Sequence, residues 1–147
     1  EEMASAAVTA ASPSTVGGLK LATTANVWAS TDGDRAIVTE HLETAAVSVP
    51  LTDAATVVID WTAGINFNVT LTANRILGNP TNEIPGQWRT VLVKGNDATD
   101  RTLTFGAEYG GTVPTLTDID DAKWYLLTIY CVAASHFIVT ATDASAP

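Results

Sequence analysis

The chain has 147 residues, 46% of them hydrophobic and 16% charged, which predicts one folded domain with at most a short appendage. Its formal net charge is −9, from 16 Asp and Glu against 7 Lys and Arg, and no basic stripe for nucleic acid is present. An acidic surface also repels anionic membranes, and no apolar stretch approaches the roughly 20 residues of a transmembrane helix, so we expect neither nucleic acid nor membrane as a partner.

The first 44 residues contain only small elements. Residues 1–15 are mostly Ala, Ser, Thr and acidic residues without periodicity, which predicts a flexible or anchoring arm. Within residues 16–44, VGGLKLAT is typical of a short strand, TDGD of a turn and TEHLETAA of a short helix. Such pieces cannot bury their own apolar faces, so we expect a small mixed module that packs on another surface.

From residue 45 to residue 147 the pattern is that of short strands. Residues 67–73, FNVTLTA, alternate apolar with polar side chains, as a strand with one buried face does. Gly, Asn, Asp and Pro clusters separate this strand from further strand-like segments, and no long amphipathic helix lies between them. The segment is therefore expected to be all-β, an antiparallel β-sandwich of the jelly-roll type. Its predicted core includes Phe67, Val69, Leu71, Leu92, Leu127 and Ile129.

The segment NRILGNPTNEIPG, residues 74–86, is predicted to be a corner. It continues the preceding strand as far as Leu77, and its two prolines then end the pairing because they lack an amide donor. Residues 79–82, Asn-Pro-Thr-Asn, are predicted to make a structural turn with an Asx-type bond, and no ligand site. Arg75 is expected at the strand's end, in solvent or paired with a carboxylate.

The sequence contains few candidates for catalytic, cofactor-binding or metal-binding residues. Alternating carboxylates can bind Ca²⁺, but the twelve-residue loop that ends in Glu is absent, so the acidic turns are predicted to be solvated. The histidines lack zinc-ligand spacing, and no nucleophile elbow or phosphate loop is present. We therefore predict no catalytic, cofactor-binding or metal-binding residue, and a buried structural thiol at Cys131. The residues considered and set aside as ligands are Asp32, Asp34, Asp118, Asp120, Asp121, His41 and His136.

Two residue types keep a carbohydrate interpretation open. Asp60 and Glu108 each stand beside an aromatic residue, as the carboxylate pair of a glycosidase often does, although polar positions on an exposed sheet face are the simpler interpretation. The four tryptophans could be platforms on which sugars stack, but in small β domains they are more often core or interface residues. They are Trp28, Trp61, Trp88 and Trp124.

Two regions resemble bacteriophage proteins. Residues 17–42, with GLKLAT, STD, RAIVT and Leu42 in this order, are similar to a module of phage tail-fibre and virion-appendage proteins, with Ser30 in place of a Gly and Glu40 in place of a Pro. The rest resembles a β domain of phage structural proteins, with Phe105 where that domain has Trp. Its landmarks here are Asp60-Trp61, residues 67–75, residues 79–82, Pro85-Gly86-Gln87 and RTLTFG.

The resemblance implies a non-enzymatic structural protein of the virion: a fibre, spike or decoration on the particle surface, of the head or the tail. It also implies a homotrimer without cofactor, in which residues 16–44 form a fibre-type oligomerisation module and the N-terminal region contacts other capsid or tail proteins. Two alternatives stay open. One is a module for host attachment that binds host glycan or another receptor, and the other is a small carbohydrate-active enzyme that uses Asp60 and Glu108.

Overall fold

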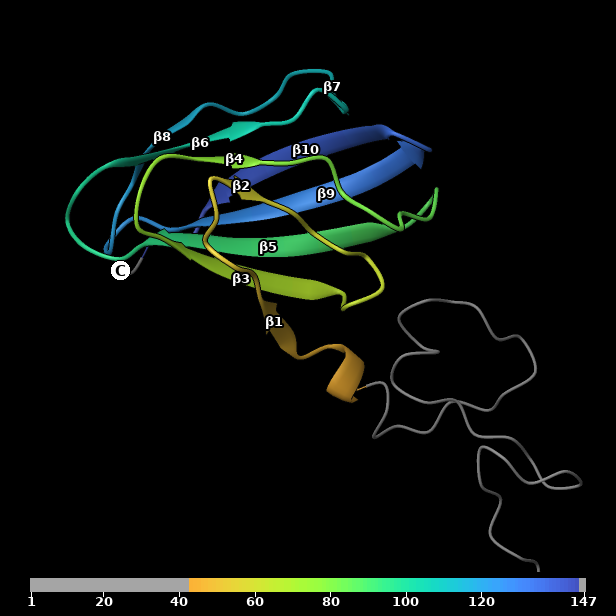
Figure 1. The fold of residues 1–147 in the computed structure, drawn as a ribbon, viewed down its shortest axis with the longest axis horizontal. Coiled ribbons are helices and arrows are strands. Elements are labelled where there is room, and N and C mark those ends of the chain that lie inside the picture. The colour runs from red at the N-terminus through yellow and green to blue at the C-terminus, as the bar shows by residue number, and fades with distance from the viewer. Residues whose placement is uncertain (1–42, 146–147) are drawn as a thin grey trace, which may run out of the picture. The chain divides into compact units, whose positions relative to one another are not determined.

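The computed structural model describes residues 43–145, and residues 46–147 belong to one compact unit (Figure 1). The predicted arm, residues 1–15, and all but the last two residues of the predicted module 16–44 lie outside the described residues. One helical turn, at residues 43–45, precedes the first strand.

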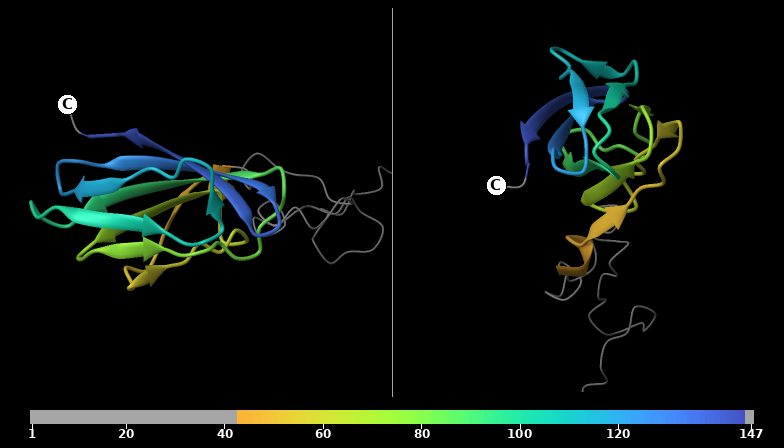
Figure 2. Two further views of the ribbon diagram at one scale, coloured as in Figure 1. Left: turned by 90° about the horizontal axis from the view of Figure 1, so that it is seen from above. Right: turned by 90° about the vertical axis from the view of Figure 1, so that its left-hand side faces the viewer.

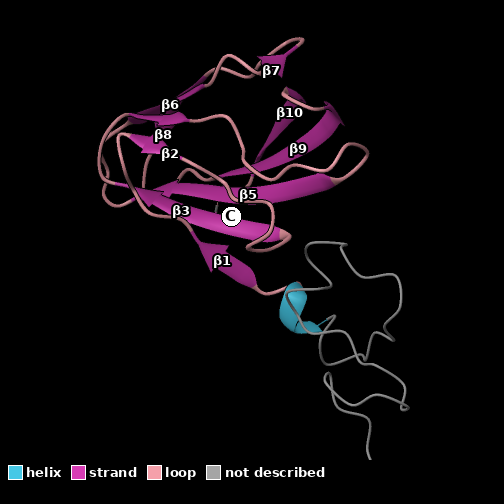
Figure 3. Ribbon diagram, turned by 45° about the vertical axis from the view of Figure 1, so that its right-hand side comes forward, coloured by secondary structure: helices cyan, strands magenta, loops and turns pink. Residues whose placement is uncertain are grey.

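The all-β expectation is confirmed, since strands make up nearly all the regular structure of the described residues (Figure 3). The strands are β1 (Ser48–Pro50), β2 (Thr56–Val57), β3 (Asn66–Leu71), β4 (Arg75–Leu77), β5 (Trp88–Gly95), β6 (Arg101–Phe105), β7 (Tyr109–Gly110), β8 (Leu116–Ile119), β9 (Tyr125–Ala133) and β10 (His136–Asp143).

These strands form two sheets that face each other across the core. The six-stranded sheet has the order β1-β3-β5-β9-β10-β7, and the four-stranded sheet has the order β2-β4-β6-β8. The first six strands alternate between the sheets, so each consecutive pair makes one turn of a coil. Figure 2 shows the same two layers from two further directions.

Successive turns of this coil stack in parallel, so the expectation of a purely antiparallel arrangement is wrong. β1, β3 and β5 pair in parallel in one sheet, as β2, β4 and β6 do in the other. A chain that crosses to the opposite sheet after each strand re-enters the first sheet in its original direction, so the strand of the other sheet makes the crossover that parallel pairing needs. Antiparallel pairs join β6 to β8, β5 to β9 and β9 to β10.

The core fills the space between the sheets. One row runs across four strands at the same register, from Val49 through Phe67 and Val91 to Leu127. Five predicted core residues, namely Phe67, Val69, Leu71, Leu127 and Ile129, are confirmed as buried. Leu92 was wrongly assigned to the core, because it lies on the outer face of β5 between the fully buried Val91 and Val93.

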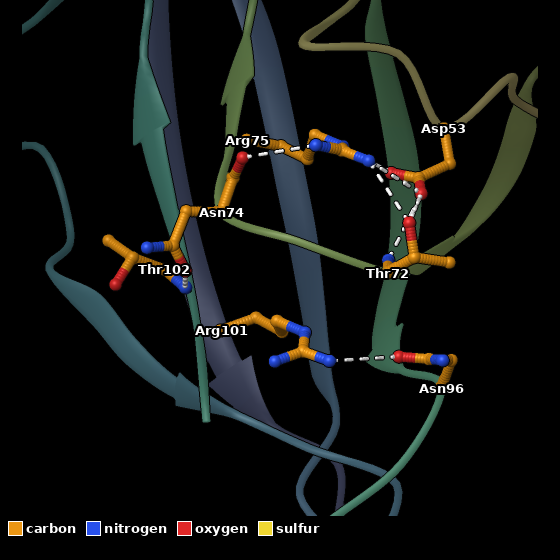
Figure 4. A network of polar contacts seen from close by, with 7 residues as sticks. All are labelled: Asp53, Thr72, Asn74, Arg75, Asn96, Arg101 and Thr102. Atoms are coloured by element: carbon orange, nitrogen blue, oxygen red, sulfur yellow. Dashed lines mark hydrogen bonds and ion pairs between the residues drawn. The ribbon is translucent and has the colours of Figure 1, made fainter. Parts of the chain in front are cut away.

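The chain leaves β3 after Leu71, and Arg75 begins a new strand in the other sheet, so the expected continuation of one strand to Leu77 is wrong. A polar network fixes this change of sheet (Figure 4). The carboxylate of Asp53 accepts hydrogen bonds from Arg75 Nε (2.6 Å) and from the Thr72 amide (3.0 Å). Arg75 is thus paired with a carboxylate, one of the two environments expected for it.

The same network continues to the third turn of the coil. Asn74 Oδ1 accepts a hydrogen bond of 2.9 Å from the amide of Thr102, and Arg101 Nη2 donates to Asn96 Oδ1 over 3.3 Å (Figure 4). Side chains therefore tie together turns that β-ladders already join.

Candidate interaction surface

The corner at residues 79–82 joins neighbouring turns of the coil. The Thr81 amide donates to the carbonyl of Ile59 (2.9 Å), and the Trp61 amide donates to the carbonyl of Thr81 (3.0 Å). Asn82 has a φ of 56°. Its Nδ2 donates to Asp60 Oδ1 over 2.9 Å, so a bond to a distant side chain replaces the expected Asx turn. At the other end of the corner, Asn79 Oδ1 accepts a hydrogen bond of 3.2 Å from the Glu108 amide.

Asp60 and Glu108 both contact this corner, but through different groups. Asp60 Oδ1 accepts hydrogen bonds from the Thr62 amide (2.9 Å), the Thr62 hydroxyl (2.7 Å) and Asn82, whereas Glu108 contacts the corner through its main-chain amide. Burial raises the pKa of the Asp60 carboxyl, but the bonds from Thr62 and Asn82 outweigh it and leave the pKa below its ordinary value. Asp60 is thus held as an ionised structural acceptor, which does not suit it to donate a proton to a glycosidic oxygen.

The carboxylates of the acidic turn before β9 bind groups of the same turn and of the start of β9. Asp118 pairs with Lys123 and accepts a hydrogen bond of 2.7 Å from the Tyr125 hydroxyl, and the bond from Lys123 holds the Asp118 pKa below its ordinary value. Asp120 Oδ1 accepts a hydrogen bond of 2.8 Å from the Ala122 amide. Between residues 43 and 145, no group of three or more His, Cys, Asp or Glu residues could hold a metal ion. Asp32, Asp34, His41 and Trp28 lie outside the described residues.

Arg89 is a buried cation that the sequence analysis did not single out. Its side chain is 3% exposed, and its guanidinium carbon lies 4.6 Å from the centroid of the Trp61 ring. Nη2 donates to the Trp61 carbonyl (3.1 Å) and to Gln87 Oε1 (3.0 Å), and Nη1 donates to the Trp88 carbonyl (2.9 Å). Desolvation lowers its pKa. Arg89 thus joins the start of β5 to Trp61 in the loop after β2, so its role is structural.

Cys131 is buried, as predicted, and its thiol lies 3.2 Å from the Ala133 carbonyl. Burial raises the pKa of the thiol, and the nearby charge of Glu83 adds to the effect. A thiol in this environment is held in its neutral form, which is the less reactive one.

The outward-facing side chains of the six-stranded sheet, called the outer face from here on, form an unusual surface. Trp88 is 52% exposed, Tyr130 43%, and Ile138 46%. The three residues lie directly opposite one another on β5, β9 and β10, so they form one row. Val132 and Leu126, both exposed, lie on the same face.

A polar row runs beside this apolar row. Thr90, Thr128 and Thr140 lie at one register with Asn66, and the Thr90 hydroxyl donates a hydrogen bond of 2.6 Å to Asn66 Oδ1. No Asp or Glu occupies an outward position on the described strands of this sheet. Those positions hold Ser48, Pro50, Asn66, Asn68, Thr70, Trp88, Thr90, Leu92, Lys94, Gly110, Leu126, Thr128, Tyr130, Val132, His136, Ile138, Thr140 and Thr142.

A hollow of about 320 Å³ lies toward the other end of this face. Its lining includes Trp124, Lys94 and Asn68. The Lys94 ammonium is 5.4 Å from the centroid of the Trp124 ring, and Trp124 Nε1 donates to the Asp121 carbonyl over 2.8 Å. Asn68 Nδ2 donates to the Ser48 hydroxyl over 2.8 Å.

Comparison of the chain with protein-family models, with curated proteins and with solved structures finds no match in any of the three. Among residues 43–145, no helix has both the length and the apolar character needed to cross a membrane.

Proposed function

We propose that this chain is a non-enzymatic structural protein of a bacteriophage virion. It forms a homotrimeric fibre, spike or decoration on the surface of the particle, with the two-sheet domain as a sandwich-like head. The N-terminal region connects this head to other capsid or tail proteins. No cofactor is required.

One observation supports the proposal most. The polar residues of the phage-like landmarks are occupied in joining turns of the coil: Asp60 binds Asn82, and Arg75 binds Asp53. Side chains committed to such bonds are not free to act on a substrate, so the landmarks favour a scaffold. A coil whose outer face has an exposed apolar row, and no carboxylate at its described outward positions, suits a component that is built into a larger assembly.

Quantitative mass spectrometry of gradient-purified particles tests this proposal. The chain should co-purify with the major capsid protein after a high-salt wash, at a copy number divisible by three. A chain that is found only in the soluble fraction of infected cells contradicts the proposal.

The non-enzymatic part has a separate test. Incubation of the full chain with host surface polysaccharide should release no new reducing ends, and Asp60→Asn should behave as the unmodified chain does. Reproducible turnover that Asp60→Asn or Glu108→Gln abolishes would favour a carbohydrate-active enzyme instead.

The hollow beside Trp124 favours a second candidate function, the binding of a host glycan during attachment. An indole ring, an ammonium group and side-chain amide and hydroxyl groups converge there, as they do in sites that bind the apolar face and the hydroxyls of a sugar. Calorimetry with host polysaccharide fragments tests this candidate. Binding that Trp124→Ala abolishes and Trp88→Ala leaves intact would support it, and the absence of binding to the full chain would contradict it.

A further inference from the structure

We infer that the outer face, centred on the row of Trp88, Tyr130 and Ile138, is the surface through which copies of this chain bind one another. The inference deepens the proposed function, on which it rests for the claim that copies assemble, by naming the surface that brings them together.

The apolar character of the row is the first argument. Three large side chains in direct register, each more than two-fifths exposed, form one continuous strip across β5, β9 and β10. Val132, 44% exposed, extends the strip along β9. Contiguous exposed apolar surface on a folded domain marks a site of interaction, and Trp and Tyr are enriched at the centres of protein interfaces.

The distribution of charge identifies the partner as another copy. Each chain carries a formal charge of −9, so two copies repel each other wherever their acidic surfaces meet. On the outer face no described outward position carries a carboxylate, so two copies can approach there without bringing acidic side chains together. The acidic side chains of the described part lie elsewhere: at Glu43, Asp53, Asp60, Glu83, Asp97, Asp100, Glu108, Asp118, Asp120, Asp121 and Asp143.

The four-stranded sheet gives a contrast within the same molecule. Its outward residue Ile76 is 45% exposed, almost the same fraction as Ile138. However, the neighbours of Ile76 at the same register are Thr56 and Thr104, whereas Ile138 stands beside Tyr130. Val58, 47% exposed, follows Thr56 by two positions, but neither it nor the register neighbours of Ile76 are aromatic, whereas Ile138 continues a row that contains Trp88 and Tyr130.

The composition of the row also favours protein over sugar. Sugar sites combine an aromatic ring with polar groups that bind hydroxyls, and the aliphatic side chains of Ile138 and Val132 provide no such groups. In the hollow, by contrast, a charged side chain lies over an aromatic ring, since the Lys94 ammonium is 5.4 Å from the centroid of the Trp124 ring.

Self-association of the full chain tests the inference. Analytical ultracentrifugation at micromolar concentration should show an oligomer for the unmodified chain. Ile138→Asp places a carboxylate in the row and should weaken association by at least about tenfold. Ile76→Asp is the matched control and should leave association unchanged. Circular dichroism of both variants should show the β-sheet spectrum of the unmodified chain, and the two substitutions form a matched pair because the two isoleucines are exposed to almost the same extent.

A second measurement keeps the inference testable if the N-terminal region also associates. Thr128→Cys places a thiol in the middle of the outer face, and Thr104→Cys places one on the four-stranded sheet, while the native Cys131 is buried. In the assembled protein, maleimide should react more slowly with the first thiol than with the second, and dilution should remove the difference.

Two results would overturn the inference, and they differ in meaning. If the full chain is an oligomer, but Ile138→Asp leaves it intact and both thiols react equally, the inference fails while the proposed function stands. If the full chain is a monomer even at high micromolar concentration, the inference and the proposed trimer fail together. In that case the partner of the outer face is a different virion protein or a glycan.

Discussion

Asp53 is the residue on which the junction of the first two coil turns depends. Its carboxylate accepts hydrogen bonds from Arg75 and Thr72, of which the bond from Arg75 lowers its pKa most, to about 2 from an ordinary 3.8. The folded state therefore holds the proton less readily than the unfolded state does. The contribution of this carboxylate to the free energy of unfolding is present in full above its ordinary pKa of 3.8. It is lost as the pH falls through the folded-state pKa of about 2.

Asp53→Asn should accordingly lower the free energy of unfolding at neutral pH, because a neutral amide cannot make the same charge-assisted bonds. The difference from the unmodified chain should shrink as the pH falls toward about 2. Urea titrations at several pH values measure this difference. Asp100→Asn, at an exposed position between β5 and β6, is the control and should change little. A difference that stays constant down to the lowest pH would show that the carboxylate's charge does not carry the effect.

Asn82 combines a backbone requirement with a side-chain bond. Its φ of 56° lies in the left-handed region, which Asn and Gly tolerate better than Ala does, and its amide binds Asp60. Asn82→Ala should lower the free energy of unfolding by roughly 0.5–2 kcal/mol, by analogy with a lost helix cap. Asn82→Gly keeps the backbone freedom and loses only the bond, so it should cost less. If the glycine variant is the less stable of the two, the backbone conformation is not what Asn82 supplies.

At the scale of single strands, alternation in the sequence predicted burial only where the two faces differ. In β3, Asn68 and Thr70 separate the buried side chains, and the predicted face is confirmed. In β5 the run Val91-Leu92-Val93 is apolar on both faces, so the sequence does not reveal which side points inward. The same ambiguity hid the outer face, because Tyr130 and Ile138 each stand between two buried apolar residues and look like core in the sequence.

Two leucines of these strands give a matched prediction. Leu71 is fully buried in β3, so Leu71→Ala should cost about 2–5 kcal/mol through lost burial and the cavity that remains. Leu92 lies on the outer face, so Leu92→Ala should cost less than about 1 kcal/mol. Denaturant titration of both variants compares the losses directly. Equal losses would contradict the assignment of the two residues to opposite faces.

The sequence did not predict that successive strands of a sheet pair in parallel, and the reason differs from that for burial. The Asn-Pro-Thr-Asn corner was visible, but whether the chain returns to the same sheet or enters the facing one depends on contacts between distant residues. Asp53 stands 22 positions before Arg75, and Asn82 stands 22 positions after Asp60. A short-range pattern does not encode such pairings. Strand-like segments with short connections therefore predicted antiparallel neighbours, although the coil stacks in parallel.

At the scale of the molecule, the described residues from Ala46 onward form one compact unit built from stacked coil turns. Ladders and side-chain networks join every turn of the coil to the next, and the Asp60 carboxylate, which looked suitable for chemistry, is engaged in one of those joints. On the outer face the row of Trp88, Tyr130 and Ile138 is exposed. A scaffold with an exposed apolar row on one face is compatible with the particle-surface component that we propose.

Cryo-electron microscopy of intact phage particles tests this account most directly. We predict density at the particle surface into which the two-sheet domain of residues 46–145 fits, arranged around a threefold axis. The density should be missing from particles that lack this chain. Particles that contain no such density, or that are unchanged when the chain is removed, would contradict the proposal that it is a structural part of the virion.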